Sequence, residues 1–235
     1  MWPFRLKKVA CGAWLQIGSI AGQSNLPLAT RYFSCSSSSF LRSASLPVQS
    51  EAELIAYAKA NPRKLNYASG GVGSTSHVAG ELFRTMAGIE WQHVPYRGTG
   101  PSLVDLLAGQ VQVTIDNLPA ILPQIKSGGV RALAISTAKR WPALPDLPTV
   151  AEAGLPGYAA ISWQMVTAPV GTPRPILDRM AATISKLTAD PAFRTRVTEA
   201  GAEPAGGTVD EARAFVKQET VKWREVVLKS GAKAD

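Results

Sequence analysis

Apolar and polar positions follow two alternating periods between residues 50 and 168. Short apolar runs of strand length, such as 65–68 and 130–135, are separated by segments whose apolar residues fall at helical spacing. Ser50 is a candidate N-cap, and the segment after it, 51–60, is predicted to be helical. The alternation of strand and helix predicts parallel βαβ units in a layered α/β fold.

Pro169 marks a change of pattern, because helical spacing then dominates and almost no strand is expected. Thr208 and Glu211 form a capping box, which predicts the start of the last helix. Amphipathic helices are predicted over 173–187, 191–201 and 211–229, and a shorter helix over 149–153.

Residues 1–44 differ from the rest of the chain in being basic, serine-rich and free of acidic residues. Three basic residues, Arg5, Lys7 and Lys8, precede a mildly apolar stretch, which is the order found in secretory signals; the composition also fits an organelle transit peptide. The serine run 34–39 is of low complexity, so this segment is expected to be a disordered leader, unrelated to the body.

The net charge of +8 does not indicate a nucleic-acid partner. The first 50 residues hold five basic residues and no acidic one, whereas the remainder carries 20 basic and 17 acidic residues. Both cysteines, Cys11 and Cys35, lie in the same N-terminal part, so no cysteine-based zinc site is available in the body. No apolar run reaches the ~20 residues of a membrane span. No cofactor is expected.

Residues 65–86 contain the clearest candidate site. An apolar strand enters a loop of glycine and hydroxyl residues, 69–77, and a helix is predicted after it. Such a loop places bare backbone N–H groups at the positive end of the helix, where anions bind. Ser74 stands where a P-loop requires lysine, which excludes that type of nucleotide site. The alternative is an ordinary turn whose hydroxyls cap the helix. The candidate ligand-binding residues are Gly70, Gly73, Ser74, Thr75, Ser76 and His77.

Two further loops, 97–102 and 116–119, follow predicted strands. In parallel sheets, ligands bind at the carboxyl ends of the strands, so the three loops are expected to share one edge. Asp116 and Asn117 are candidate ligand-binding residues, because an aspartate there can accept a hydrogen bond from a ligand hydroxyl or amine. A turn or helix N-cap is the alternative interpretation of this pair.

An enzymatic site is weakly supported. His77 lies close in sequence to Ser74, which would allow a hydrolytic pair, but the chain has no G-x-S-x-G elbow. The other histidine, His93, falls inside a predicted strand, and two histidines without a nearby carboxylate make a poor zinc site. We therefore assign no catalytic residue and no metal ligand, and keep a hydrolase using His77 and Ser74 as the less favoured alternative.

Several segments between Ser45 and Asp235 carry a family resemblance. They include LNYASGGVGSTSHVAGELF, HVPYRGTGPSLVDLLAGQVQVTIDNLPAILPQIKSGGVRALAIS, ALPDLPTVAEAGLPGY and GAEPAGGT. This part resembles the substrate-binding proteins of tripartite tricarboxylate transporters, the Bug (TctC-like) family. The resemblance implies a periplasmic receptor of the type II binding-protein fold that binds without catalysis. Its ligand would be a dicarboxylate, tricarboxylate, acidic amino acid or aromatic acid, which it hands to a membrane permease. The loop 69–77 and Asp116 match the family's ligand-binding positions.

The resemblance leads us to expect that the first-lobe βαβ units of that family are missing before Ser45. The chain is therefore expected to divide into an unrelated leader (1–44), a complete second lobe (45–163) and a helical return to an incomplete first lobe (164–235). Apolar faces of the last helices would then be exposed, and ligand binding would be weak, or lost altogether in a non-functional remnant. The residues of those faces are Ile176, Met180, Ile184, Phe215, Trp223 and Val226.

Overall fold

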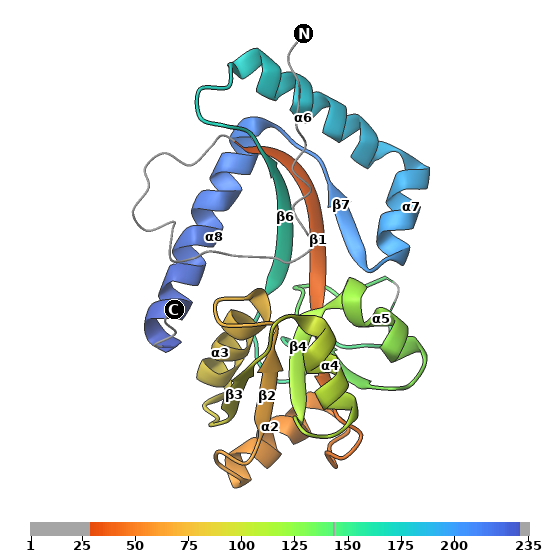
Figure 1. The fold of residues 1–235 in the computed structure, drawn as a ribbon, viewed down its shortest axis with the longest axis vertical. Helices are drawn as coiled ribbons and strands as arrows, with labels where there is room; N and C mark the ends of the chain where they lie inside the picture. Colours follow the sequence, from red (N-terminus) through yellow and green to blue (C-terminus); the bar gives the residue numbers. More distant parts are fainter. Residues whose placement is uncertain (1–28, 143, 231–235) are drawn as a thin grey trace.

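The computed structural model describes residues 29–142 and 144–230. The strands in this part are β1 (Ala29–Arg42), β2 (Asn66–Ser69), β3 (Gln92–Pro95), β4 (Val113–Asn117), β5 (Arg131–Ile135), β6 (Ile161–Thr167) and β7 (Ala202–Ala205). The helices are α2 (Glu51–Ala60), α3 (Thr75–Ala87), α4 (Thr99–Leu107), α5 (Leu118–Lys126), α6 (Arg174–Ala189), α7 (Pro191–Glu199) and α8 (Val209–Ser230). Figure 1 shows their arrangement.

The main sheet has the strand order β3-β2-β4-β1-β5. Strand β2 pairs in parallel with both β3 and β4, which confirms the predicted βαβ units. Strand β1 is antiparallel to β4 and β5. Because Ser38 pairs with Asn117 and Arg42 with Val113, the carboxyl end of β4 points toward the N-terminal part of β1.

Two apolar cores cover the two faces of the main sheet. On one face α2, α3 and α8 pack around Tyr67, Phe83 and Trp91. On the other face α4 and α5 contribute Leu106 and Leu122 to a second core. The sheet is therefore the middle layer of three, as the mixed α/β pattern predicted.

A second sheet is built on the same long strand. The N-terminal part of β1 pairs with β6 and β7, both antiparallel, above the main sheet in Figure 1. Helices α6, α7 and α8 surround these strands, and Leu177 of α6 packs with Ala168 and Val209 in a small separate core.

Strand β1 corrects the prediction of a disordered leader for residues 29–42; residues 1–28 lie outside the described part. Serine lacks the branched or aromatic side chain that signals a strand. Its small volume nevertheless suits a strand that is hydrogen-bonded on both sides and contacted by α5, α6 and α8. Ser38 and Ser39 are both fully buried.

Two smaller expectations are also wrong. Residues 149–153 form a turn instead of a helix, with Thr149 Oγ1 accepting a hydrogen bond from the backbone N of Glu152. Strand β7 interrupts a tail that was expected to be almost wholly helical, and its Pro204 gave no strand signal.

The C-terminal helices are less exposed than predicted. Trp223 of α8 is only 4% exposed and joins the core of the main sheet, and the ring of Phe215 meets Trp163 of β6 edge-on at 5.6 Å. Ile176 on α6 is 49% exposed, as the sequence indicated. Helix α6 packs against β1 and α7 against β7, whereas α8 packs against both β1 and α3.

Candidate ligand-binding site

Three helices begin at the same edge of the main sheet. Helices α3, α4 and α5 follow β2, β3 and β4, which run in the same direction, so the three predicted loops meet where the strands end. A Cβ on Gly70 would lie 3.7 Å from Cα of Gly98, which shows that the first two loops touch. This edge faces the second sheet, because the end of β4 points along β1 toward it.

The first loop is held by its own hydrogen bonds. Ser74 Oγ caps α3 by accepting a hydrogen bond from the backbone N of His77, and it donates to the carbonyl oxygen of Gly71. Ser76 Oγ accepts from the backbone N of Gly70 at 2.9 Å and lies 2.9 Å from Ser74 Oγ. Thr75 is the first residue of α3. The hydroxyls therefore shape the loop before any ligand arrives.

The expectation of bare N–H groups in this loop is wrong for two of the predicted residues. The N–H of Gly70 is bonded to Ser76, and that of Gly73 donates to Nδ1 of His77 at 3.0 Å. The open helix start is instead that of α4, whose N-cap is Gly98 and carries no side-chain cap. Helix α5 also lacks a side-chain cap at Asn117, and each of these two first turns contains one proline without an N–H, Pro101 in α4 and Pro119 in α5. The start of α4 is the less obstructed of the two, because Gly98 and Gly100 carry no side chain.

The two histidines lie against each other beside the first loop. Ser69 Oγ lies 2.6 Å from Nε2 of His93, and Tyr67 stacks on the other side of His93 with 4.8 Å between ring centroids. Burial lowers the pKa of both histidines, that of His93 to about 4, and each imidazole is consequently neutral at pH 7.

The predicted hydrolytic pair is not formed. Nδ1 of His77 is occupied by the N–H of Gly73, and the Ser74 hydroxyl bonds to the backbone and to Ser76. The structure pairs Ser69 with His93 instead, but Ser69 is fully buried. Within the described residues, no carboxylate is hydrogen-bonded to His93, so the arrangement lacks the third group of a triad.

Asp116 and Asn117 are the last two residues of β4 and lie at the same edge. Asp116 is 5% exposed; its Oδ1 accepts from the N–H of Asn117 at 2.8 Å, while Oδ2 has no partner among the described residues. Burial raises the pKa of the Asp116 carboxyl, outweighing the Asn117 N–H and the Thr99 side chain, which lower it. Asn117 Oδ1 accepts from Ser38 Oγ at 3.3 Å.

Ser39 is a site residue that the sequence did not reveal. It lies directly opposite Asp116 in the β1–β4 ladder, and its buried Oγ also has no partner among the described residues. Directly paired residues of antiparallel strands project to the same face of the sheet. The only sequence signal was a serine run, which by itself indicates low complexity.

The described residues contain no group of three His, Cys, Asp or Glu side chains that could hold a metal ion. Within the described residues, no helix is both long enough and apolar enough to cross a membrane.

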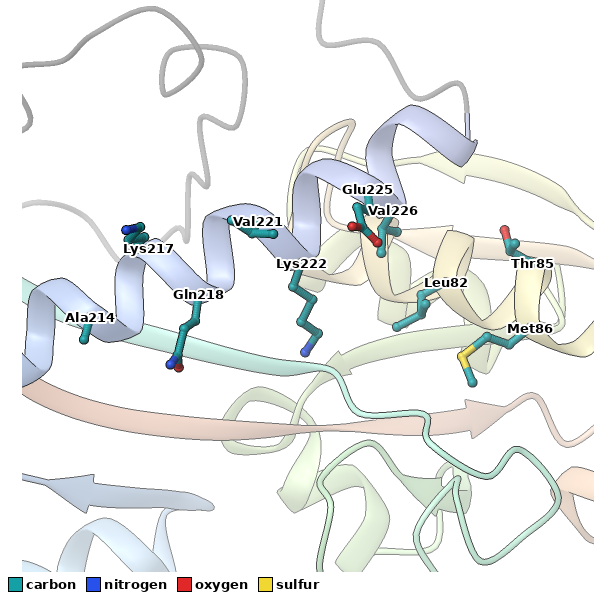
Figure 2. Close-up of a pocket in the computed structure, with 10 residues that line it drawn as sticks. All are labelled: Leu82, Thr85, Met86, Ala214, Lys217, Gln218, Val221, Lys222, Glu225 and Val226. Atoms are coloured by element: carbon teal, nitrogen blue, oxygen red, sulfur yellow. The ribbon is translucent and has the colours of Figure 1, made fainter.

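A separate groove lies between α3 and α8. Figure 2 shows Leu82 and Met86 of α3 on one wall and Val221 of α8 on the other, around a volume of about 830 Å³. This groove borders the later turns of α3, whereas the candidate site is at its first turn.

The two-sheet fold, with its loops gathered at the carboxyl ends of parallel strands, is that of a solute-binding protein. The chain belongs to the tripartite tricarboxylate transporter family receptor (TctC) family, whose model matches residues 27–232. The match includes part of the segment that the sequence had suggested was an unrelated leader.

Named relatives fit this assignment. The chain is 39% identical to the protein BugT of Bordetella pertussis over 180 residues, which are 77% of this chain and 55% of BugT. It superposes on the R. palustris protein Rpa4515 with adipate at a TM-score of 0.81 and 42% identity, covering 88% of this chain and 69% of that one. For MatC of Rhodopseudomonas palustris with bound malate, the TM-score is 0.75 and the identity 31%, over 86% and 69% of the two chains. The chain spans about half the length of the curated relatives it matches. Members of this family are periplasmic solute-binding receptors.

Proposed function

We propose that this protein is an extracytoplasmic receptor that binds a small carboxylate at the shared edge of β2, β3 and β4 and delivers it to the permease subunits of a tripartite tricarboxylate-type transporter. It performs no catalysis. The ligand-binding residues are those of the first loop, Gly70, Gly73, Ser74, Thr75, Ser76 and His77, together with Asp116 and Asn117.

The observation that carries this proposal is the open start of α4 beside the hydrogen-bonded first loop. Gly98 caps α4 without a side chain, and Thr99 and Gly100 form its first turn. A ligand carboxylate at this position meets the positive end of the helix. The relatives described with adipate and malate support a dicarboxylate as ligand.

The proposal is tested by isothermal calorimetry of the full chain with adipate, malate, succinate, citrate and glutamate. We expect at least one dicarboxylate to bind. The variant Gly100→Asp places a carboxylate in the first turn of α4, where a Cβ meets no atom within 4 Å. A carboxylate at this position is stabilised by the helix dipole, so we expect the variant to fold. The introduced carboxylate would, however, occupy the position proposed for the ligand carboxylate. We expect affinity to fall by about tenfold or more, equivalent to ~1.4 kcal/mol.

The matched control is Ala52→Asp, which adds the same charge at the second position of α2, at the opposite end of the sheet in Figure 1. It should leave the affinity unchanged. Equal losses in both variants would mean that net charge, and not the start of α4, determines binding. Absence of binding for every carboxylate would favour the non-functional remnant over the receptor.

A further inference from the structure

Asp116 and Ser39 each place one buried oxygen without a hydrogen-bond partner among the described residues at the candidate site, Oδ2 and Oγ respectively. Asp116 is buried and is adjacent to two helix starts, through the backbone N–H of Asn117 at α5 and the side chain of Thr99 at α4. Ser39 faces it from β1. Buried polar atoms without a partner are rare in native proteins and call for an explanation.

None of the ion pairs among the described residues involves Asp116. The charged side chain next to the start of α4 is Arg97, which directly precedes the N-cap Gly98 and is exposed. The neighbouring elements present hydroxyl and amide groups: Ser39 on β1, Thr99 on α4 and Asn117 at the start of α5. The titratable groups at this edge from β3 and α3 are His93 and His77, and both are neutral at pH 7.

A ligand carboxylate and an ionised Asp116 would compete for the same positive helix start. Like charges close together in a poorly solvated site each favour the neutral form of the other. The N–H groups at the helix start stabilise the negative charge of the ligand carboxylate, so the ligand stays ionised. The buried Asp116 is then the group that becomes neutral, by taking a proton from solvent.

We propose that Asp116 takes up a proton from solvent when a carboxylate binds at the start of α4, so that ligand binding and protonation of Asp116 are coupled. This inference rests on the proposed receptor function. By linkage, the ligand raises the proton affinity of Asp116, and lower pH tightens ligand binding by the same coupling. At most one proton is taken up per ligand, which corresponds to about a tenfold change in affinity per pH unit at full coupling.

Proton uptake is measured by titrating the wild-type chain with adipate or malate in buffers of equal pH but different ionisation enthalpy, from pH 5 to pH 8. The slope of the observed heat against buffer enthalpy gives the protons bound. We expect a positive fraction of one proton for the wild type. Asp116→Asn keeps the shape and the neutral charge of the protonated acid. Whatever its affinity for the ligand, the binding that it retains should proceed without this uptake. Asp105→Asn makes the same chemical change on α4, where Asp105 accepts from Tyr96, and should retain the uptake.

The outcomes separate this inference from the receptor proposal. Binding by the wild type with no proton uptake across the whole pH range overturns the inference alone, as does equal uptake in wild type and Asp116→Asn. Absence of any binding overturns both. Should Asp116→Asn fail to fold, carbon-13 NMR of the wild-type Asp116 carboxyl decides: its pKa must rise on addition of ligand, and an unchanged value overturns the coupling.

Discussion

The imidazole rings of His77 and His93 stack with their centroids 4.1 Å apart and their planes inclined by 4°. His77 lies in the first turn of α3, and His93 lies on the edge strand β3. Each ring also contacts the first loop: His93 lies against Ser69 at its start, and His77 accepts a hydrogen bond from Gly73 in its middle. The charge state of this histidine pair therefore affects the fold of the binding loop.

The histidine pair predicts a loss of stability in acid. Burial is the larger cause and the nearby charge of His77 the smaller one of a lowered pKa for His93, which is about 4 instead of the ordinary 6.5. Between those values the unfolded chain binds a proton that the folded chain does not. The free energy of unfolding that depends on His93 consequently falls as the pH drops from 6.5 toward 4. Urea denaturation at a series of pH values measures this slope.

His93→Gln is the control, because its amide can still bond to Ser69 but does not titrate. We expect the stability of the variant to fall less steeply over pH 6.5 to 4 than that of the wild type. Parallel slopes for the two proteins would show that His93 does not contribute.

A comparison of two N-cap serines distinguishes an effect on stability from an effect on ligand binding. Ser74 caps α3 at the candidate site, and Ser50 caps α2 by accepting a hydrogen bond from the backbone N of Glu53. Replacing either serine by alanine should lower the free energy of unfolding by about 1 kcal/mol. Only Ser74→Ala should also weaken carboxylate binding, as measured by calorimetry. A similar loss of affinity in Ser50→Ala would contradict the assignment of the site to the first loop.

Gly80 is required by close packing and not by backbone conformation. A Cβ at this position in α3 would overlap the ring of Tyr67, with Cζ only 2.8 Å away. Alanine favours a helix by about 1 kcal/mol over glycine, but overpacking a buried site costs ~1–3 kcal/mol. We therefore expect Gly80→Ala to lower the melting temperature. Gly100→Ala, where a Cβ meets nothing within 4 Å, should raise it; a gain in both variants would show that Tyr67 can move aside.

The buried carboxyl of Glu51 predicts that stability falls as the pH rises, which is the opposite of the effect expected for His93. The side chain is fully buried in the first turn of α2, and neither carboxyl oxygen has a partner among the described residues. Burial raises its pKa to about 8. The folded chain therefore keeps a proton that the unfolded chain releases near pH 4.5, so this contribution to stability declines as the pH rises from 4.5 to 8.

Glu51→Gln removes the titration while keeping the shape of the side chain. We expect the variant to be more stable than the wild type at pH 8 by ~1–3 kcal/mol, and the difference to vanish near pH 4.5. Chemical denaturation at these two pH values checks the prediction, and a difference that does not change with pH would refute it.

Local signals in the sequence predicted much of the fold. The N-cap Ser50 and the capping box of Thr208 and Glu211 act within one helical turn, and both are confirmed. Such contacts depend on neighbouring residues, so the sequence carries them directly.

The central strand could not be predicted in the same way. Ser38 and Ser39 are buried because distant segments of the chain cover β1 on both faces and pair along both of its edges. For the same reason, the internal hydrogen bonds of Gly70 and Gly73 were missed, since a glycine-rich loop indicates free N–H groups only until its serine and histidine partners are placed. The position of Ser39 opposite Asp116 likewise depends on strand register.

Strand β1 belongs to both sheets, and this limits how they can move. Its residues before Ser38 pair with β6 and β7, and those from Ser38 onward pair with β4 and β5. The sheets cannot separate by sliding apart without breaking hydrogen bonds along this strand. A change in the angle between them must therefore occur as torsion along β1, with its hydrogen-bond ladders retained. The amide protons of β1 would then resist exchange with solvent equally at every angle between the two sheets.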